Sequence, residues 1–157
     1  MTEDAITDYI ISNFPGAEVI RPEEAGGPDI ANGDRFFMHS PDPQRPAKMP
    51  FATIVTKDYG ELDNASRLNR DGVFRLNVGV GKETFRLIVG TSAESERDYS
   101  VLDRILPHPV YAAQSWVCIL NPSDETFHEL LAPLLAEAYQ IAGRRDPKQQ
   151  PVGDGHG

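Results

Sequence analysis

The chain has one cysteine, Cys118, and its sequence predicts neither a secretion signal nor a membrane span. A single cysteine excludes an internal disulfide and the paired-cysteine motifs of zinc and redox sites. The first residues are acidic, and no apolar run approaches the roughly 18 residues that a membrane helix requires. We therefore predict a cytoplasmic protein that has no membrane association and no cofactor, with Cys118 as a small buried residue.

Basic residues are also scarce, with 15 Lys and Arg against 24 Asp and Glu and a formal net charge of −9. Binding to nucleic acid or to an anionic membrane depends on Lys and Arg, so neither is an expected partner. The histidines His39, His108 and His128 lie in three different predicted elements. Their spacing is not that of metal ligands, so no metal site is predicted.

A chain of 157 residues fits one domain with one core. Its 13 prolines and 13 glycines predict long loops. Four prolines within residues 40–50 predict an extended surface loop, which could also serve as a lid. After residue 145 only Val152 has the character of a core residue, so we predict one domain over residues 1–145 and a disordered tail over residues 146–157.

Apolar periodicity predicts the regular elements. Helical spacing predicts four helices, over residues 3–14, 82–89, 99–106 and 123–145. Pro133 should kink the last of them or divide it in two. Apolar and β-branched runs predict five strands, over residues 17–20, 34–39, 51–56, 73–80 and 115–120. The Asn32-Gly33 pair before the second strand is a hairpin signal.

The strand over residues 73–80 has the clearest alternation in the chain. Four apolar residues at every second position are typical of the buried face of an antiparallel strand: Phe74, Leu76, Val78 and Val80. The intervening Arg75 and Asn77 should then lie on a solvated face. Strands joined mostly by short turns predict an α+β fold, with a mostly antiparallel sheet and helices packed on one face.

The segment of residues 107–116 carries the first candidate site. His108 stands between Pro107 and Pro109, which restrict the backbone of an imidazole able to act as acid, base or hydrogen-bond donor. Tyr111 and Trp116 follow closely and are candidate pocket walls. A purely structural alternative is a rigid turn in which His108 is hydrogen-bonded to the backbone.

Arg75 and Asn77 form the second candidate, because a guanidinium beside an amide can receive a carboxylate or phosphate. A solvated sheet face explains the same pair. Residues 64–90 carry five basic side chains against two acidic ones, which makes this the one region that favours an anionic ligand. The acidic stretches of residues 58–63 and 98–103 have no predicted partner.

The glycine-rich residues 79–84 superficially suggest a phosphate loop. The pattern lacks one required glycine, and Glu83 stands where Ser or Thr should follow the lysine. Nucleotide binding is therefore not predicted. No arrangement of Ser, Cys and His indicates nucleophilic catalysis, so a hydrolase is not predicted either.

Four pieces of the chain resemble an uncharacterised family of short bacterial proteins, common in actinobacteria and known only as a domain of unknown function. They are KMPFATIVTKD at residues 48–58, GVFRLNVGVGKETFR at 72–86, LDRILPHPVYAAQSWVCILNP at 102–122 and the closing LLAEAYQIAGRR. This resemblance covers most of the predicted domain. It implies no reaction and no binding residue.

A more distant resemblance is to MmcQ/YjbR-like proteins, which have a compact α+β fold suggested to bind DNA. It depends on short matches in the same order, at Pro50-Phe51-Ala52, His108-Pro109, Trp116-Val117 and Glu137-Ala138-Tyr139. The resemblance implies that fold. The negative charge and the proline-rich loop are departures from the pattern, and a shared fold does not imply a shared function.

The sequence leaves open whether the chain is an enzyme. The first hypothesis is an accessory domain that binds a small ligand or a protein partner through Arg75, Asn77, His108, Tyr111 and Trp116. The second is a small-molecule enzyme in which His108 is the general acid or base and residues 40–50 form a lid. Weak DNA binding is a third and less favoured one. The oligomeric state is left open.

Overall fold

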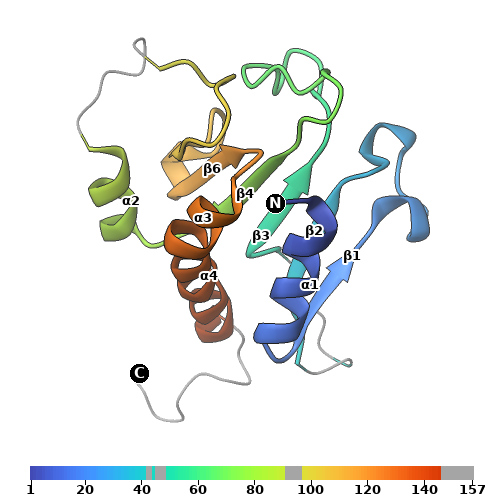
Figure 1. Cartoon of the computed structure of the whole chain (residues 1–157). Helices are drawn as coiled ribbons and strands as arrows, with labels where there is room; N and C mark the ends of the chain where they lie inside the picture. The colour runs from blue at the N-terminus through green and yellow to red at the C-terminus, as the bar shows by residue number, and fades with distance from the viewer. Residues whose placement is uncertain (42–43, 45–48, 91–96, 146–157) are drawn as a thin grey trace.

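A six-stranded antiparallel sheet organises the part of the chain that the computed structural model describes, residues 1–41, 44, 49–90 and 97–145 (Figure 1). The strands are β1 (Ala17–Ile20), β2 (Arg35–His39), β3 (Ala52–Val55), β4 (Arg75–Gly79), β5 (Leu106–Pro107) and β6 (Trp116–Leu120). Their order across the sheet is β1-β2-β3-β4-β6-β5, and each neighbouring pair is antiparallel. This is a single-domain α+β fold, as predicted.

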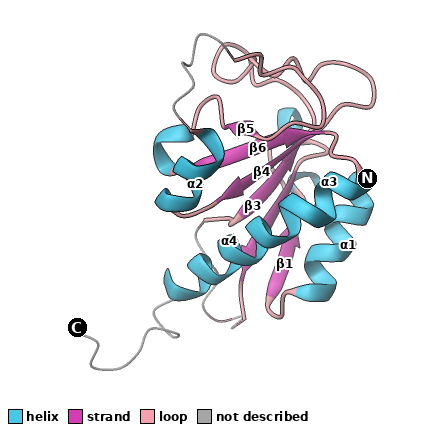
Figure 2. Cartoon of the chain, turned by 60° about the vertical axis from the view of Figure 1, so that its left-hand side comes forward, coloured by secondary structure: helices cyan, strands magenta, loops and turns pink. Residues whose placement is uncertain are grey.

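The helices are α1 (Glu3–Asn13), α2 (Lys82–Val89), α3 (Asp124–Thr126) and α4 (Ala132–Arg145). Figure 2 shows α1, α3 and α4 on one side of the sheet, with α2 beside the β5 end. Short 3-10 turns add Pro22–Glu24, Asp29–Ala31 and Ala112–Gln114. The side chains of Thr2 and Ser123 accept backbone N–H groups at the starts of α1 and α3.

The C-terminal helix changes geometry just before Pro133, although it is continuous over residues 124–145. The turn between α3 and α4, Phe127–Leu131, has π-helical geometry, and Pro133 is the second residue of α4. Proline has no N–H to donate, so it is best tolerated near the start of a helix. A π-helical turn therefore lies directly before the proline, the chain stays helical through it, and a kink at Pro133 stays a prediction.

The main core lies between the sheet and α1, α3 and α4. Strand residues that point to this helix side include Phe37, Ile54, Leu76, Val78 and Ile119. They meet fully buried helix residues, among them Ile6, Ile10, Phe127, Leu131 and Leu135. Burial of each such side chain contributes about 1.5–3 kcal/mol, so this face supplies most of the hydrophobic stabilisation.

The structure confirms the five predicted strands and the helices that became α1 and α2. The helix predicted over residues 99–106 is wrong, because no helix forms at residues 97–105 and Leu106–Pro107 is strand β5. Asp103 has a left-handed backbone, with φ of 58°, which ends any helical run. Pairing with β6 thus prevails over a weak local helical pattern.

Two further expectations need correction. The segment that joins β1 to β2 is residues 21–34 with two 3-10 turns, so Asn32-Gly33 does not form a two-residue hairpin. The second face of β4 is not solvated, because the side chains of Arg75 and Asn77 are only 1% and 2% exposed. A cover of loops buries this polar face.

Predictions for the proline-rich loop and the tail fall largely on residues 42–43, 45–48 and 146–157, which lie outside the described residues. Within the residues that are described, no helix has the length and apolar character to cross a membrane.

Candidate functional site

Polar side chains gather on the second face of the sheet, opposite the helices. Asn77 on β4 lies opposite Thr53 on β3, and its Nδ2 donates to Thr53 Oγ1 at 2.9 Å. The Arg75 side chain extends along the same strand, where its Nε donates to Asn77 Oδ1 at 2.8 Å. Side-chain alternation on the paired strands therefore places Thr53, Arg75 and Asn77 on one face of the sheet.

The loop that follows β3, residues 56–74, closes over Arg75. Asp63 accepts from both terminal nitrogens of the guanidinium, at 3.0 Å from Nη1 and 2.6 Å from Nη2. Ser66 Oγ accepts from Nη1 at 2.9 Å. A bidentate carboxylate pairs with both the charge and the planar geometry of a guanidinium. Arg75 is therefore neutralised from within the chain.

His108 completes this group at the end of β5. Its Nε2 lies 3.3 Å from Arg75 Nη2, and its Nδ1 accepts the backbone N–H groups of Val110 and Tyr111 at 3.0 Å each. Burial, aided by the Arg75 charge, lowers the pKa of His108 from 6.5 to about 3. The ring is therefore neutral at physiological pH. We call Thr53, Asp63, Ser66, Arg75, Asn77 and His108 the Arg75 cluster.

Two aromatic side chains border the Arg75 cluster. Tyr111 is 50% exposed, and its ring centroid lies 4.9 Å from that of His108. Trp116 lies opposite Gly79 across the β4–β6 pair. A Cβ atom at Gly79 would come within 2.8 Å of the Trp116 indole, so only glycine allows this close approach. The five residues predicted from the sequence thus share one face of the sheet, and whether they bind a ligand stays a prediction.

The sequence reasoning missed Asp63, Ser66 and Thr53 as members of the cluster. The statement that residues 58–63 have no partner is wrong, because Asp63 pairs with Arg75 and Asp58 accepts the Leu68 N–H at 2.8 Å. The only signal for these contacts is the need of a buried arginine for a carboxylate. Arg75 belongs to the basic stretch of residues 64–90, and Asp63 neutralises its positive charge.

A second polar contact anchors the same loop to the sheet. Asp34 is fully buried just before β2 and accepts the Tyr59 hydroxyl and the Thr56 N–H. Burial raises the pKa of Asp34 from 3.8 to about 6, although the Thr56 N–H opposes that shift. The opposite end of the loop is apolar, where Leu68 packs on Val55 and Leu120. The cover of the Arg75 cluster is thus fixed at both ends.

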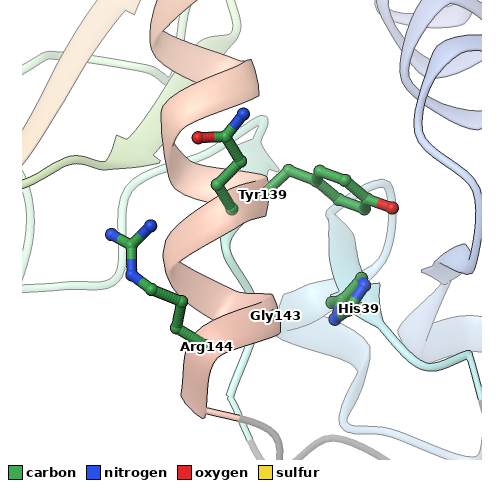
Figure 3. A pocket seen from close by; sticks show the side chains of 5 residues that line it. His39, Tyr139, Gly143 and Arg144 are labelled. Atoms are coloured by element: carbon green, nitrogen blue, oxygen red, sulfur yellow. The ribbon is translucent and has the colours of Figure 1, made fainter. Parts of the chain in front are cut away.

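A separate pocket of about 290 Å³ lies on the helix side of the sheet (Figure 3). Its lining residues are His39, Tyr139, Gln140, Gly143 and Arg144. Tyr139 packs edge-on against His39, with 4.7 Å between ring centroids, and its hydroxyl donates to Pro15 O at 2.6 Å. Figure 3 shows Arg144 pointing away from this pair. None of the residues predicted for the site lines this pocket.

The glycine-rich loop before α2 receives a carboxylate from α4. Glu137 accepts the Gly81 N–H at 2.7 Å and the Thr84 hydroxyl at 2.7 Å. A helix N-terminus attracts anions, and here a side chain of the protein takes that position. The Gly81 N–H and the Thr84 hydroxyl are thus bonded within the chain, and the absence of a nucleotide site stays a prediction.

The cysteine and the histidines that were considered as metal ligands lie in different elements of the fold. Cys118 is buried, as expected, and burial raises the pKa of its thiol to about 12. His39 lies on β2, His108 after β5, and His128 is exposed in the π-helical turn. Among the described residues, no three His, Cys, Asp or Glu side chains are grouped as metal ligands would be.

Comparison with known proteins gives one match. Residues 1–151 match a family described as a family of unknown function (DUF6194). No curated protein and no solved structure matches the chain. The resemblance to MmcQ/YjbR-like proteins and the actinobacterial association therefore stay predictions.

Proposed function

Because the chain belongs to this family of unknown function, its role has to be inferred from its own side chains, and we propose that it is a binding domain. The contact surface is the segment of residues 107–116, where Tyr111 and Trp116 meet the ligand or partner. Arg75, Asn77 and His108 are the frame beneath them. One observation carries this proposal: Tyr111 is half exposed and its ring lies beside that of His108, which belongs to a buried and internally bonded polar cluster.

The hydrogen bonds of the Arg75 cluster favour a framing role over direct anion capture. All three guanidinium nitrogens of Arg75 contact protein side chains, and Asp63 already occupies the bidentate position. A second carboxylate would have to displace Asp63 and leave that charge without its partner. Breaking a buried ion pair costs about 3–5 kcal/mol, which few small ligands can offset. The exposed Tyr111 ring and the partly exposed Trp116 indole are the better contacts.

Acid–base catalysis by His108 is the alternative function. Two features give it less support. The pKa of about 3 leaves no imidazolium to act as an acid at neutral pH, and both ring nitrogens already have close neighbours in the protein. Nothing comparable restricts the exposed Tyr111 ring, so a binding function requires fewer changes to the folded state.

A ligand screen that uses the only tryptophan as a reporter tests the proposal. Thermal shift against a panel of amino acids, nucleosides, sugars and carboxylic acids identifies candidates, and Trp116 fluorescence then measures their affinity. Tyr111→Ala should weaken binding about tenfold, because an aromatic contact contributes about 0.5–1.5 kcal/mol beyond its buried area. A pull-down with the same variant covers protein partners.

Leu130→Ala is the matched control, because Leu130 is also 50% exposed but lies in the π-helical turn on the helix side. It should leave affinity unchanged. Tyr111→Ala should keep the melting temperature close to that of the parent protein, since it removes an exposed ring. A binder that responds equally to both variants, or a screen and pull-down without any binder, would contradict the proposal.

A further inference from the structure

The two edges of the sheet differ in the backbone groups that they offer to a further strand. β5 forms one edge and β1 the other. On β5, the His108 N–H donates to Trp116 O of β6 at 2.9 Å, so the residue before it, Pro107, turns its backbone away from the sheet. Proline has no N–H, and the β5 edge therefore presents no donor at this position.

The β1 edge has no such block. The strand contains neither proline nor lysine, the residues that commonly protect an edge. None of its residues is buried, whereas every residue of β3 is. Figure 1 shows β1 at the outer border of the sheet. An edge strand of this kind exposes a row of backbone groups that can pair with another strand.

The pairing with β2 determines which backbone groups of β1 point outward. The Ser40 N–H donates to Gly16 O at 2.7 Å, so every second residue from Gly16 onward bonds to β2. Val19 falls on the alternate positions. Its neighbour Phe37 accepts the Phe51 N–H from the opposite side at 2.9 Å, which agrees with this assignment. The N–H and C=O groups of Val19 therefore both point away from the sheet.

The same alternation turns Ala17 and Arg21 outward, but each has one group already bonded. The Ala17 N–H donates to Phe14 O at 3.0 Å, and Arg21 O accepts the Glu24 N–H at 3.0 Å. Within the described part of the chain, the outward groups left for a partner are the carbonyl of Ala17, both groups of Val19 and the N–H of Arg21. This set is complementary to itself when it is reversed about Val19.

We propose that β1 pairs antiparallel with β1 of a second copy of this chain, about a twofold axis at Val19. In this pairing each Val19 N–H donates to the Val19 carbonyl of the other copy, and each Arg21 N–H donates to the other Ala17 carbonyl. An unrelated extended segment would present a carbonyl to the Ala17 N–H, which is already used. In a second copy this carbonyl belongs to Arg21 and is bonded to Glu24 N–H. The second copy is therefore the better match.

The proposed interface is independent of the proposed binding function. It lies at the β1 edge, whereas the segment of residues 107–116 lies at the β5 end of the sheet. A result at either place leaves the other unchanged.

The first test combines sedimentation equilibrium with amide hydrogen exchange measured by NMR. We expect the mass to double as the concentration rises. The Glu18 and Ile20 amides, which bond to β2, should exchange slowly in monomer and dimer, whereas those of Val19 and Arg21 should be protected only in the dimer. A chain that stays monomeric at about 1 mM would overturn the inference. Protection of Val19 only on addition of a different protein would assign the edge to that partner and overturn it as well.

The second test is Val19→Pro, which removes an outward N–H and no hydrogen bond to β2. It should raise the dissociation constant of the dimer at least about tenfold, because each dimer loses the hydrogen bond of both Val19 N–H groups. Val19→Thr keeps the N–H and a β-branched side chain, so it is the control and should still dimerise. Circular dichroism checks that both variants fold. A dimer that Val19→Pro leaves unchanged would overturn the inference.

A crosslink tests the register and does not depend on the folding of the proline variant. Pairing about Val19 places Glu18 of one copy opposite Ile20 of the other, as a non-hydrogen-bonded pair with Cα atoms about 4.5 Å apart. That distance lies within the range of a disulfide. Glu18→Cys/Ile20→Cys should therefore form a covalent dimer on mild oxidation with diamide. Leu130→Cys, at an exposed residue of the helix side, is the control and should stay monomeric. Equal crosslinking of the two variants, or none, would contradict the pairing.

Discussion

The two faces of the sheet are buried by different means. On the helix side, apolar strand residues meet apolar residues of α1, α3 and α4. On the second face, the same strands bury Arg75 and Asn77 beneath the irregular loop of residues 56–74. Figure 1 shows this loop in green beside the yellow segment of residues 97–105, and Arg70 Nη2 joins them by donating to Ser100 O at 3.0 Å.

The difference matters for how each face responds to change. Apolar packing is non-directional, so it tolerates side chains of similar volume. The Arg75 cluster depends on directed hydrogen bonds, and each lost partner leaves a buried polar group unsatisfied. The helix side therefore supplies the bulk of the stability, while the second face supplies a single fixed arrangement of polar groups.

Removal of the arginine should have the largest effect. We expect Arg75→Met to lower the free energy of unfolding by about 3–5 kcal/mol, because Asp63 is left as a largely buried charge without its partner. Urea unfolding followed by circular dichroism measures the change. The double variant Arg75→Met/Asp63→Leu should regain much of the loss. Arg86→Met, at an exposed arginine of α2, is the control and should change stability by less than about 0.5 kcal/mol.

A change in pH should act on the second face through two groups, His108 and Asp34, whose contributions to stability change in opposite directions. His108 has a pKa below its unfolded value, so the stability that it contributes is lost as pH falls from 6.5 toward 3. Asp34 has a pKa raised to about 6, so its protonation adds stability as pH falls from 6 toward 3.8. The two contributions largely cancel in the parent protein.

Single variants should reveal these opposed contributions. Between pH 6.5 and pH 4, the parent protein should lose about 3 kcal/mol relative to His108→Asn and gain about 2 kcal/mol relative to Asp34→Asn. Urea unfolding of all three proteins at both pH values measures the differences. A parallel response of the three proteins would mean that neither group changes its pKa on folding.

Conservative substitutions on the two faces should also differ in the free energy of unfolding that they cost, but by a smaller amount. Arg75→Lys keeps the charge but not the fork that contacts Asp63, Ser66 and Asn77, and should cost about 2–3 kcal/mol. Leu135→Met, at a fully buried position on the helix side, should cost less than about 1.5 kcal/mol. Equal losses measured by urea unfolding would show that the two faces are equally tolerant.

The same contrast explains what could be predicted from the sequence. Periodicity identified the strand of Phe74, Leu76 and Val78 because regular elements cover its apolar side. The burial of Arg75 could not be foreseen, since its partner Asp63 lies in a segment without periodicity. Sequence did indicate His108 as a rigid-turn residue, and the backbone bonds to its Nδ1 agree with the structural alternative. Contacts made by irregular loops depend on the folded backbone and have no local signal.

The smallest predicted effect concerns α2, none of whose side chains is buried. Glu137 on α4 holds the start of this helix through Gly81 N–H and Thr84 Oγ1. Glu137→Ala should therefore cost about 1–2 kcal/mol and increase hydrogen exchange at residues 81–84 before it affects the strands. Glu129→Ala, at an exposed glutamate of the π-helical turn, is the control. Unchanged exchange at α2 would mean that packing beside β5, and not the carboxylate, fixes this helix to the sheet.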